Sequence, residues 1–182
     1  MQQTATSTKT YTIDEAHSTI RFWVRHLMIS KVHGEIPDIT GAVVYDEANP
    51  SETKIDVTIK LESLTTRQEQ RDGHLKSADF FDVANFPTMT YKSTGVTKAG
   101  GETFTVNGDL TLHGVTKPVP LTVEVSPEIT SPFGGFKVGV TAKGVLNRED
   151  FGMGWNQVLE AGGFAVGKEV TFEIDLELDR PA

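Results

Sequence analysis

The sequence predicts an all-β domain built from antiparallel strands, and three observations support this fold class. Apolar and polar residues alternate with a period of two through most of the chain, as in strands with one buried and one solvated face. Short turn signals separate the alternating runs, for example Asn49-Pro50 and Gly100-Gly101. The segment 67–76 breaks the pattern and reads as a short polar helix.

The strands are justified in chain order by their apolar faces, whose intervening residues are mostly Thr, Lys, Arg, Asp and Glu. These faces are formed by Ile20, Phe22 and Val24; by Ile55, Val57, Ile59 and Leu61; by Phe104, Val106, Leu110 and Leu112; by Leu121, Val123 and Val125; by Val138, Val140, Ala142 and Leu146; and by Phe172, Ile174, Leu176 and Leu178. Asn107-Gly108 resembles a hairpin turn, but the apolar phase runs straight through it. We therefore interpret Gly108 as a bulge or a close approach within one long strand.

The helical insertion lies between these strands. Thr66 and Glu69 have the spacing of a capping box, which predicts a helix over residues 67–76. A second capped turn with Phe80 and Phe81 follows, and Pro87 closes the insertion before the next strand.

About eight strands with one apolar face each can form a closed barrel or a two-sheet sandwich. Several runs reach about ten residues, whereas strands typically have five or six. This length favours the barrel, and the sandwich stays open as the alternative.

Composition limits the function classes. The chain of 182 residues has a net charge of −8, which disfavours nucleic acid as a partner, and its basic residues form no continuous tract. It contains no cysteine and no apolar run long enough for a transmembrane helix, so we expect no disulfide and no stable membrane insertion. We expect residues 1–10 to be a disordered tail and residues 11–182 to form a single domain. As written, the chain shows no signal peptide and is expected in the cytoplasm, or in the periplasm if it is a processed form.

No complete catalytic or metal-binding pattern occurs in the sequence. The five histidines form no H-x-H pair, and the nucleophile motif G-x-S-x-G is missing, so we expect no enzyme, no metal and no cofactor. An enzyme reading would use His74 with Asp72, or Arg148 with Asp150, as acid–base groups. These clusters could also place Arg71, His74 or Arg148 against a polar headgroup at the barrel mouth, but ion pairs that fix the helix and a loop to the barrel rim are favoured over that contact.

Five ordered motifs give the chain its resemblance to a known family. They are Asp14-x-x-His17-Ser18-x-Ile20-x-Phe22-x-Val24-x-His26; Arg71-Asp72-x-His74-Leu75-x-Ser77-x-Asp79-Phe80-Phe81-Asp82; Phe86-Pro87-x-Met89-x-Tyr91-x-Ser93; Gly108-x-Leu110-x-x-His113-Gly114-Val115-Thr116-Lys117-Pro118-Val119; and Asn147-Arg148-x-Asp150-Phe151-Gly152-Met153. From about Tyr11 to Leu178 the chain resembles the YceI family of lipocalin-like, polyisoprenoid-binding proteins.

The resemblance implies an extended eight-stranded antiparallel lipocalin-like barrel with a short helical insertion. It also implies a homodimer and a tunnel that holds a long isoprenoid chain, of the isoprenoid quinone or polyprenyl type. The expected tunnel lining consists of Ile20, Phe22, Val24, Val57, Ile59, Leu61, Phe81, Phe86, Met89, Tyr91, Val106, Leu110, Leu121, Val123, Val138, Val140, Leu146, Phe151, Met153, Trp155, Phe172 and Ile174. The candidate headgroup contacts are Arg71, His74 and Arg148.

Three hypotheses follow from this reading. The leading one is a protein that carries, stores or sequesters a polyisoprenoid lipid. The second is an enzyme that acts on an apolar isoprenoid-like substrate inside the same barrel. The third is a structural barrel filled by its own side chains, and the size of the interior separates it from the other two.

Overall fold

The computed structural model describes residues 8–182, and its first element, β1 (Thr8–Ile13), already belongs to the barrel. A 3-10 turn, η1 (Glu15–His17), separates β1 from β2 (Thr19–His26). Both strands pair with the same partner, β12 (Val166–Arg180), and so act as one interrupted strand. The domain thus begins three residues earlier than the predicted boundary, and the rest of the predicted tail lies outside the described residues.

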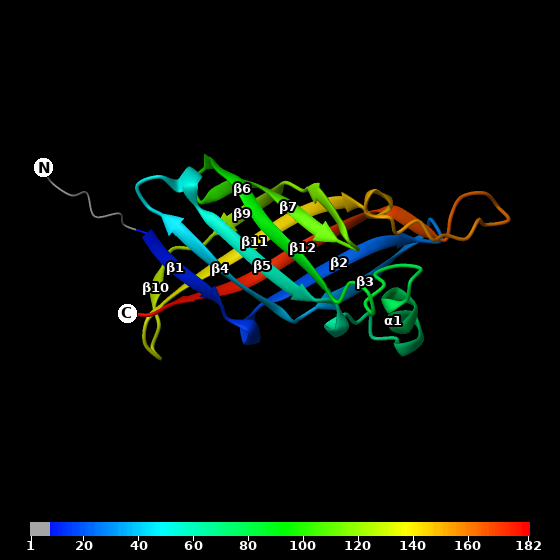
Figure 1. Ribbon diagram of the computed structural model, residues 1–182, viewed down its shortest axis with the longest axis horizontal. Helices are drawn as coiled ribbons and strands as arrows, with labels where there is room; N and C mark the ends of the chain where they lie inside the picture. Colours follow the sequence, from blue (N-terminus) through cyan, green and yellow to red (C-terminus); the bar gives the residue numbers. More distant parts are fainter. Residues whose placement is uncertain (1–7) are drawn as a thin grey trace, which may run out of the picture.

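The remaining strands follow as an antiparallel meander (Figure 1). They are β3 (Ser30–Ile36), β4 (Ile39–Asp46), β5 (Lys54–Lys60), β6 (Thr88–Gly100), β7 (Thr103–Leu112), β8 (Val115–Pro118), β9 (Leu121–Val125), β10 (Ile129–Thr130) and β11 (Phe136–Asn147). Both β3 and β4 pair with the interrupted β1–β2 strand, and both β8 and β9 pair with β7. Each of these pairs therefore takes one place in the barrel.

Strand β12 closes the barrel. It pairs with β11 from Phe136↔Arg180 to Asn147↔Glu169 on one side, and with β1 and β2 on the other. The result is a closed barrel of eight antiparallel strand positions, which confirms the predicted fold class and removes the sandwich alternative.

The helical insertion packs at one end of the barrel. Helix α1 (Glu69–Lys76) begins two residues later than predicted, and in Figure 1 it lies at the end opposite the C-terminus. The predicted capping box does not form. The Asp72 carboxylate accepts hydrogen bonds from the Thr66 amide at 2.7 Å and the Thr65 hydroxyl at 3.0 Å, and the Gln68 side chain caps the helix instead. Three further 3-10 turns are η2 (Pro50–Glu52), η3 (Leu61–Ser63) and η4 (Arg148–Phe151).

A glycine inside β7 lets one aromatic side chain lie flat on the barrel wall. A Cβ atom at Gly108 would lie 2.4 Å from Cζ of Tyr91 on β6. The prediction of a close approach inside a continuous strand is therefore confirmed.

Within residues 8–182, no helix is long and apolar enough to cross a membrane.

Candidate functional site: an apolar cavity in the barrel

The barrel encloses a cavity of about 510 Å³, within the range of pockets that hold small organic ligands. Alternate residues of each barrel strand point inward, and most of them are Val, Ile and Leu. An eight-stranded barrel can be filled by its own side chains or can hold one small ligand, and the cavity volume shows that these side chains leave part of the axis open. The hypothesis of a structural barrel packed solid by its own side chains is therefore wrong.

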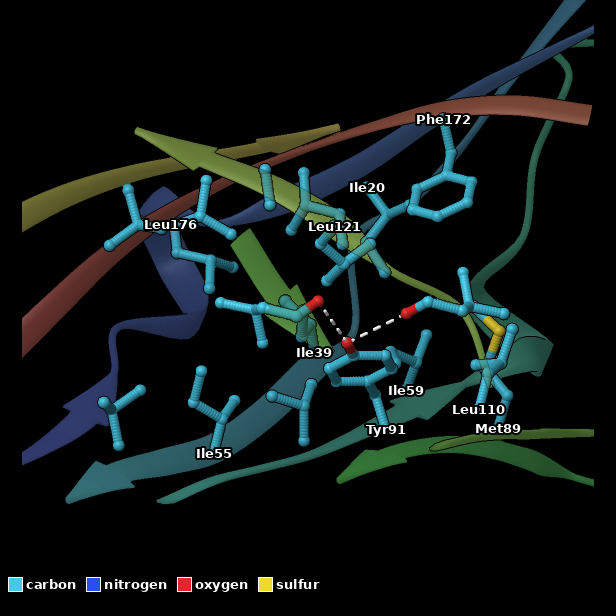
Figure 2. Close-up of a pocket in the computed structure, with 18 of the residues that line it drawn as sticks. Ile20, Ile39, Ile55, Ile59, Met89, Tyr91, Leu110, Leu121, Phe172 and Leu176 are labelled. Atoms are coloured by element: carbon cyan, nitrogen blue, oxygen red, sulfur yellow. Dashed lines mark hydrogen bonds between the residues drawn. The ribbon is translucent and has the colours of Figure 1, made fainter. Parts of the chain in front are cut away.

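Most of the residues predicted to line a tunnel lie on the wall of this cavity. They are Ile20, Phe22, Val24, Val57, Ile59, Phe81, Met89, Tyr91, Val106, Leu110, Leu121, Val123, Val138, Val140, Leu146, Met153, Phe172 and Ile174. Figure 2 shows Ile20, Ile59, Leu110, Leu121 and Phe172 directed toward one another from separate strands.

Two of the predicted lining residues are buried outside the cavity. Leu61 continues the phase of β5, but the chain has already turned into η3, where the Leu61 amide bonds to the Pro87 carbonyl at 3.0 Å. Phe151 lies in η4, and its carbonyl bonds to Nδ1 of His113 at 2.9 Å. Both side chains fill the packing around the barrel end instead of the cavity wall.

Two predicted aromatic lining residues also lie elsewhere. The Phe86 ring packs edge-on against His113, with 5.0 Å between the ring centroids, and covers Gly114. The Trp155 ring lies 4.7 Å from the ring of His74. Both residues belong to loops beyond the strand ends, where strand periodicity no longer tells which way a side chain points.

The cavity wall also includes residues that the sequence did not identify. Tyr11 of β1, Ile36 of β3, and Ile39, Val43 and Tyr45 of β4 all face the interior. The alternation at Lys9, Tyr11 and Ile13 was available as a signal, although Lys9 interrupts its apolar character.

Tyr91 places a hydroxyl on the largely apolar wall. Its hydroxyl lies 3.0 Å from the Val119 carbonyl and 3.3 Å from the Val106 carbonyl, the two contacts drawn as dashed lines in Figure 2. Burial raises the pKa of the Tyr91 phenol well above its usual range. The hydroxyl is thus bonded to the wall rather than presented to a ligand.

Arg148 is the one predicted headgroup contact that reaches the cavity. Its side chain is only 3% exposed. Its guanidinium donates to the carbonyls of Met153, Trp155 at 2.9 Å, Val166 at 3.4 Å and Gly167 at 2.8 Å. Burial lowers its pKa from the ordinary arginine value. Four of the five guanidinium N–H donors are thereby used to join the η4 loop to the start of β12.

The other two predicted headgroup contacts lie outside the cavity. Arg71 donates to the Thr66 hydroxyl at 2.7 Å and the Thr66 carbonyl at 2.9 Å, so it stabilises the start of the insertion. His74 bonds to the Asp79 carboxylate at 2.9 Å. Neither side chain is part of the cavity wall, and the hydrogen-bond partners of both, Thr66 and Asp79, lie within the insertion itself.

At the end opposite α1 the cavity reaches charged residues, and we call this end the polar mouth (Lys9, Tyr11, Glu47 and Glu128). The Lys9 ammonium lies 3.4 Å from Glu47 and 3.6 Å from Glu128. The Tyr11 hydroxyl donates to Glu128, and Arg180 pairs with the same carboxylate at 3.2 Å. Burial, together with the Glu128 carboxylate, raises the pKa of Tyr11 to about 12.

One cluster outside the cavity has the composition of a metal site. Asp14, His17 and Glu177 place their ligand atoms within 4.8 Å of one another. However, the Lys137 ammonium bonds to Glu177 and lies 3.2 Å from Asp14. The lysine already neutralises this acidic group, and the hydrogen bond from His17 lowers the pKa of Asp14 to about 2.

Comparison with known proteins now identifies the family. The model of the YceI-like domain matches residues 11–178. The chain belongs to the YceI family. A UPF0312 protein of Staphylococcus aureus (strain N315) is 40% identical over 168 residues, covering 92% of this chain and 95% of that protein. A UPF0312 protein of Photorhabdus laumondii is 44% identical over 135 residues, 74% of this chain and 70% of the relative.

Solved structures share the YceI barrel. The Campylobacter jejuni YceI protein is 30% identical, with a TM-score of 0.71 over 87% of this chain and 90% of its own. Burkholderia cenocepacia BcnA superposes with a TM-score of 0.79 at 21% identity, over 91% and 98% of the two chains. A polyisoprenoid binding domain from Saccharophagus degradans has a TM-score of 0.67 at 18% identity, over 94% and 98%. The last two similarities concern the fold alone.

Proposed function

We propose that this YceI protein binds one long-chain polyisoprenoid lipid, of the isoprenoid quinone or polyprenyl type, inside the barrel, and carries, stores or sequesters it. The observation that carries the proposal is the cavity of about 510 Å³, whose wall consists mostly of aliphatic and aromatic side chains. The name of the Saccharophagus degradans domain supports the choice of ligand class.

The wall chemistry explains why a branched hydrocarbon would bind without a specific headgroup. Each buried methylene contributes about 0.8 kcal/mol, so one five-carbon isoprene unit contributes up to roughly 4 kcal/mol. About five buried units would approach the affinity limit of non-covalent complexes near 20 kcal/mol, before ordering costs are subtracted. The hydrocarbon chain therefore supplies the affinity, and the polar groups contribute orientation.

Binding is favoured over catalysis because the acid–base groups of the enzyme hypothesis do not meet in the cavity. His74 and Asp72 are engaged with Asp79 and with Thr65 and Thr66, outside its wall. Of the second pair, Arg148 reaches the cavity, whereas Asp150 is exposed and is not part of the wall. We keep Arg148 alone as the candidate headgroup contact, since one of its N–H donors is not used by the four carbonyl bonds.

The test compares two alanine substitutions on opposite faces of the barrel. Ala142 lies on the cavity wall of β11, whereas Ala42 of β4 lies between Thr12 and Asp56 on the outer face. Ala142→Trp fills the cavity, and Ala42→Trp adds the same side chain outside it. The wild type and both variants are purified from the native host, and the bound lipid is measured by native mass spectrometry and by organic extraction.

We expect a co-purifying isoprenoid with the wild type and with Ala42→Trp, and an at least tenfold lower occupancy with Ala142→Trp. Circular dichroism of Ala142→Trp checks that the barrel is retained. Wild-type protein that carries no lipid and takes up no added polyprenol, although folded, would overturn the proposal. Equal lipid content in the two variants would place the ligand outside the cavity.

A further inference from the structure

The tip of the β2–β3 hairpin exposes three consecutive large apolar side chains. Leu27, Met28 and Ile29 are 40%, 63% and 80% exposed. The loop 157–165 lies against them: the Leu27 amide bonds to the Ala165 carbonyl at 2.8 Å, and Gly163 packs on Met28. This loop adds two more exposed apolar side chains, Val158 and Phe164. We call these five apolar residues the apolar tip. An exposed apolar patch of this kind, rimmed by polar residues, marks an interaction site.

The backbone of the tip is strained for the residues it contains. Leu27 and Met28 have φ angles of 48° and 65°, the left-handed conformation required at both central positions of a type I′ hairpin turn. Asn-Gly is the favoured sequence for such a turn, whereas bulky side chains raise its energy. A leucine and a methionine at these two positions therefore cost stability relative to the favoured turn sequence.

The flanks of the same hairpin are basic. Arg25 and Lys31 are exposed and lie directly opposite each other, a cross-strand pairing of like charges that destabilises a sheet. The next outward-facing residue on β2 is Trp23, with the Lys31 ammonium 5.4 Å from its ring centre. Residues 21–34 contain no Asp or Glu, although the whole chain has a net charge of −8.

We infer that the apolar tip, with Arg25 and Lys31 as its collar, docks onto the surface of an anionic lipid bilayer. Apolar side chains at the acyl boundary, a tryptophan and a basic collar at the headgroups are the composition of an interfacial membrane anchor. The cavity reaches the base of this hairpin, because Val24 and Val166, which lie next to the tip, both line the cavity wall. Docking would bring this end of the cavity to the membrane, a use that rests on the proposed function.

The first test separates membrane binding from stability. Leu27→Asn combined with Met28→Gly installs the favoured turn sequence, so this variant should unfold at the same or a higher temperature than the wild type. Flotation with phosphatidylcholine vesicles containing 30% phosphatidylglycerol should show at least a tenfold higher half-saturating lipid concentration for the variant. Phe133→Ser is the matched control, because Phe133 is 94% exposed in the loop before β11. It should bind like the wild type.

The second test addresses the basic collar. Lys31→Glu turns the repulsive cross-strand pair with Arg25 into an attractive one, and it should weaken binding to the anionic vesicles about tenfold. Lys54→Glu, at the start of β5, is the charge-matched control and should change binding little. Raising the salt concentration should weaken wild-type binding more than that of Lys31→Glu, because salt screens the attraction between the collar and the vesicle.

Wild-type protein that does not float with anionic vesicles overturns the docking. So does loss of self-association, rather than of vesicle binding, in the turn variant when it is measured by sedimentation velocity, since the tip would then be an interface between copies. The lipid content of the same preparations is measured in parallel. Lipid-loaded protein that ignores vesicles leaves the proposed function standing, whereas empty protein that binds vesicles leaves only the docking.

Discussion

Replacing Arg148 by methionine removes the buried guanidinium that joins the η4 loop to β12. Methionine keeps most of the side-chain volume but cannot donate hydrogen bonds. The carbonyls of Met153, Trp155 and Gly167 lose this donor, whereas the Val166 carbonyl keeps a bond from the Asn156 amide at 2.7 Å. The variant therefore tests whether these carbonyl bonds stabilise the end of the barrel next to α1.

The expected loss follows from the three carbonyls that are left without this partner. At about 1 to 1.5 kcal/mol per bond, their loss amounts to about 3 to 4.5 kcal/mol. Removing a buried charge recovers part of this amount, because the guanidinium no longer has to be desolvated. We expect the free energy of unfolding to fall by about 3 kcal/mol, a large fraction of the 5–15 kcal/mol typical of a domain.

Urea unfolding at pH 7, followed by tryptophan fluorescence and circular dichroism, measures this change. The control is Arg67→Met, because the Arg67 side chain is 84% exposed and should change stability by less than about 0.5 kcal/mol. A loss below about 1 kcal/mol for the Arg148 variant would refute the reasoning. Other groups would then satisfy these carbonyls, and the buried Arg148 guanidinium would be available to bind a ligand in the cavity.

Three smaller perturbations test other parts of the structure. Gly108→Ala would place its Cβ atom 2.4 Å from Tyr91 and should lower the free energy of unfolding by about 1–3 kcal/mol; an unchanged melting temperature would contradict the close approach. Gly73→Ala lies in α1, where no neighbouring atom comes within 4 Å of the new Cβ. This substitution should raise the free energy of unfolding by about 0.5–1 kcal/mol. The pKa of Tyr11 is about 12 against an ordinary 10.0. The protonated Tyr11 phenol therefore contributes fully to the stability of the fold below pH 10, and this contribution is lost as the pH rises through 12. Glu128→Gln should lower the Tyr11 midpoint in an absorbance titration, and an unmoved midpoint would exclude the carboxylate as a cause.

The strands with regular alternation were predictable because most of their inward positions carry apolar side chains. Leu121 and Val123 on β9, and Phe172 and Ile174 on β12, face the cavity as the period of two predicts. The close approach at Gly108 was predictable for the same reason, since the phase continues through it.

Apart from Tyr11, the missed wall residues named above lie on β3 and β4, where glycine takes an inward position. A Cβ atom at Gly34 of β3 would lie 2.3 Å from the Phe22 ring, and one at Gly41 of β4 would lie 2.3 Å from the Asp56 carbonyl. Neighbouring strands fill these positions, so the apolar period is broken in the local sequence although the wall is continuous in space. Ile36 and Ile39 were overlooked for this reason.

The basic collar also depends on strand pairing. Arg25 and Lys31 are six residues apart in sequence and form no basic tract, yet the hairpin register places them opposite each other. The homodimer and the cellular compartment depend on surfaces and segments beyond the barrel interior, and they stay predictions.

The affinity for linear polyprenols of increasing length, measured at constant headgroup, tests the central claim most directly. If the apolar cavity supplies the binding energy, affinity should rise steeply with each added isoprene unit and reach a plateau once the cavity is filled. Ala142→Trp should reach that plateau at a shorter chain. Affinity that is independent of chain length would contradict the account.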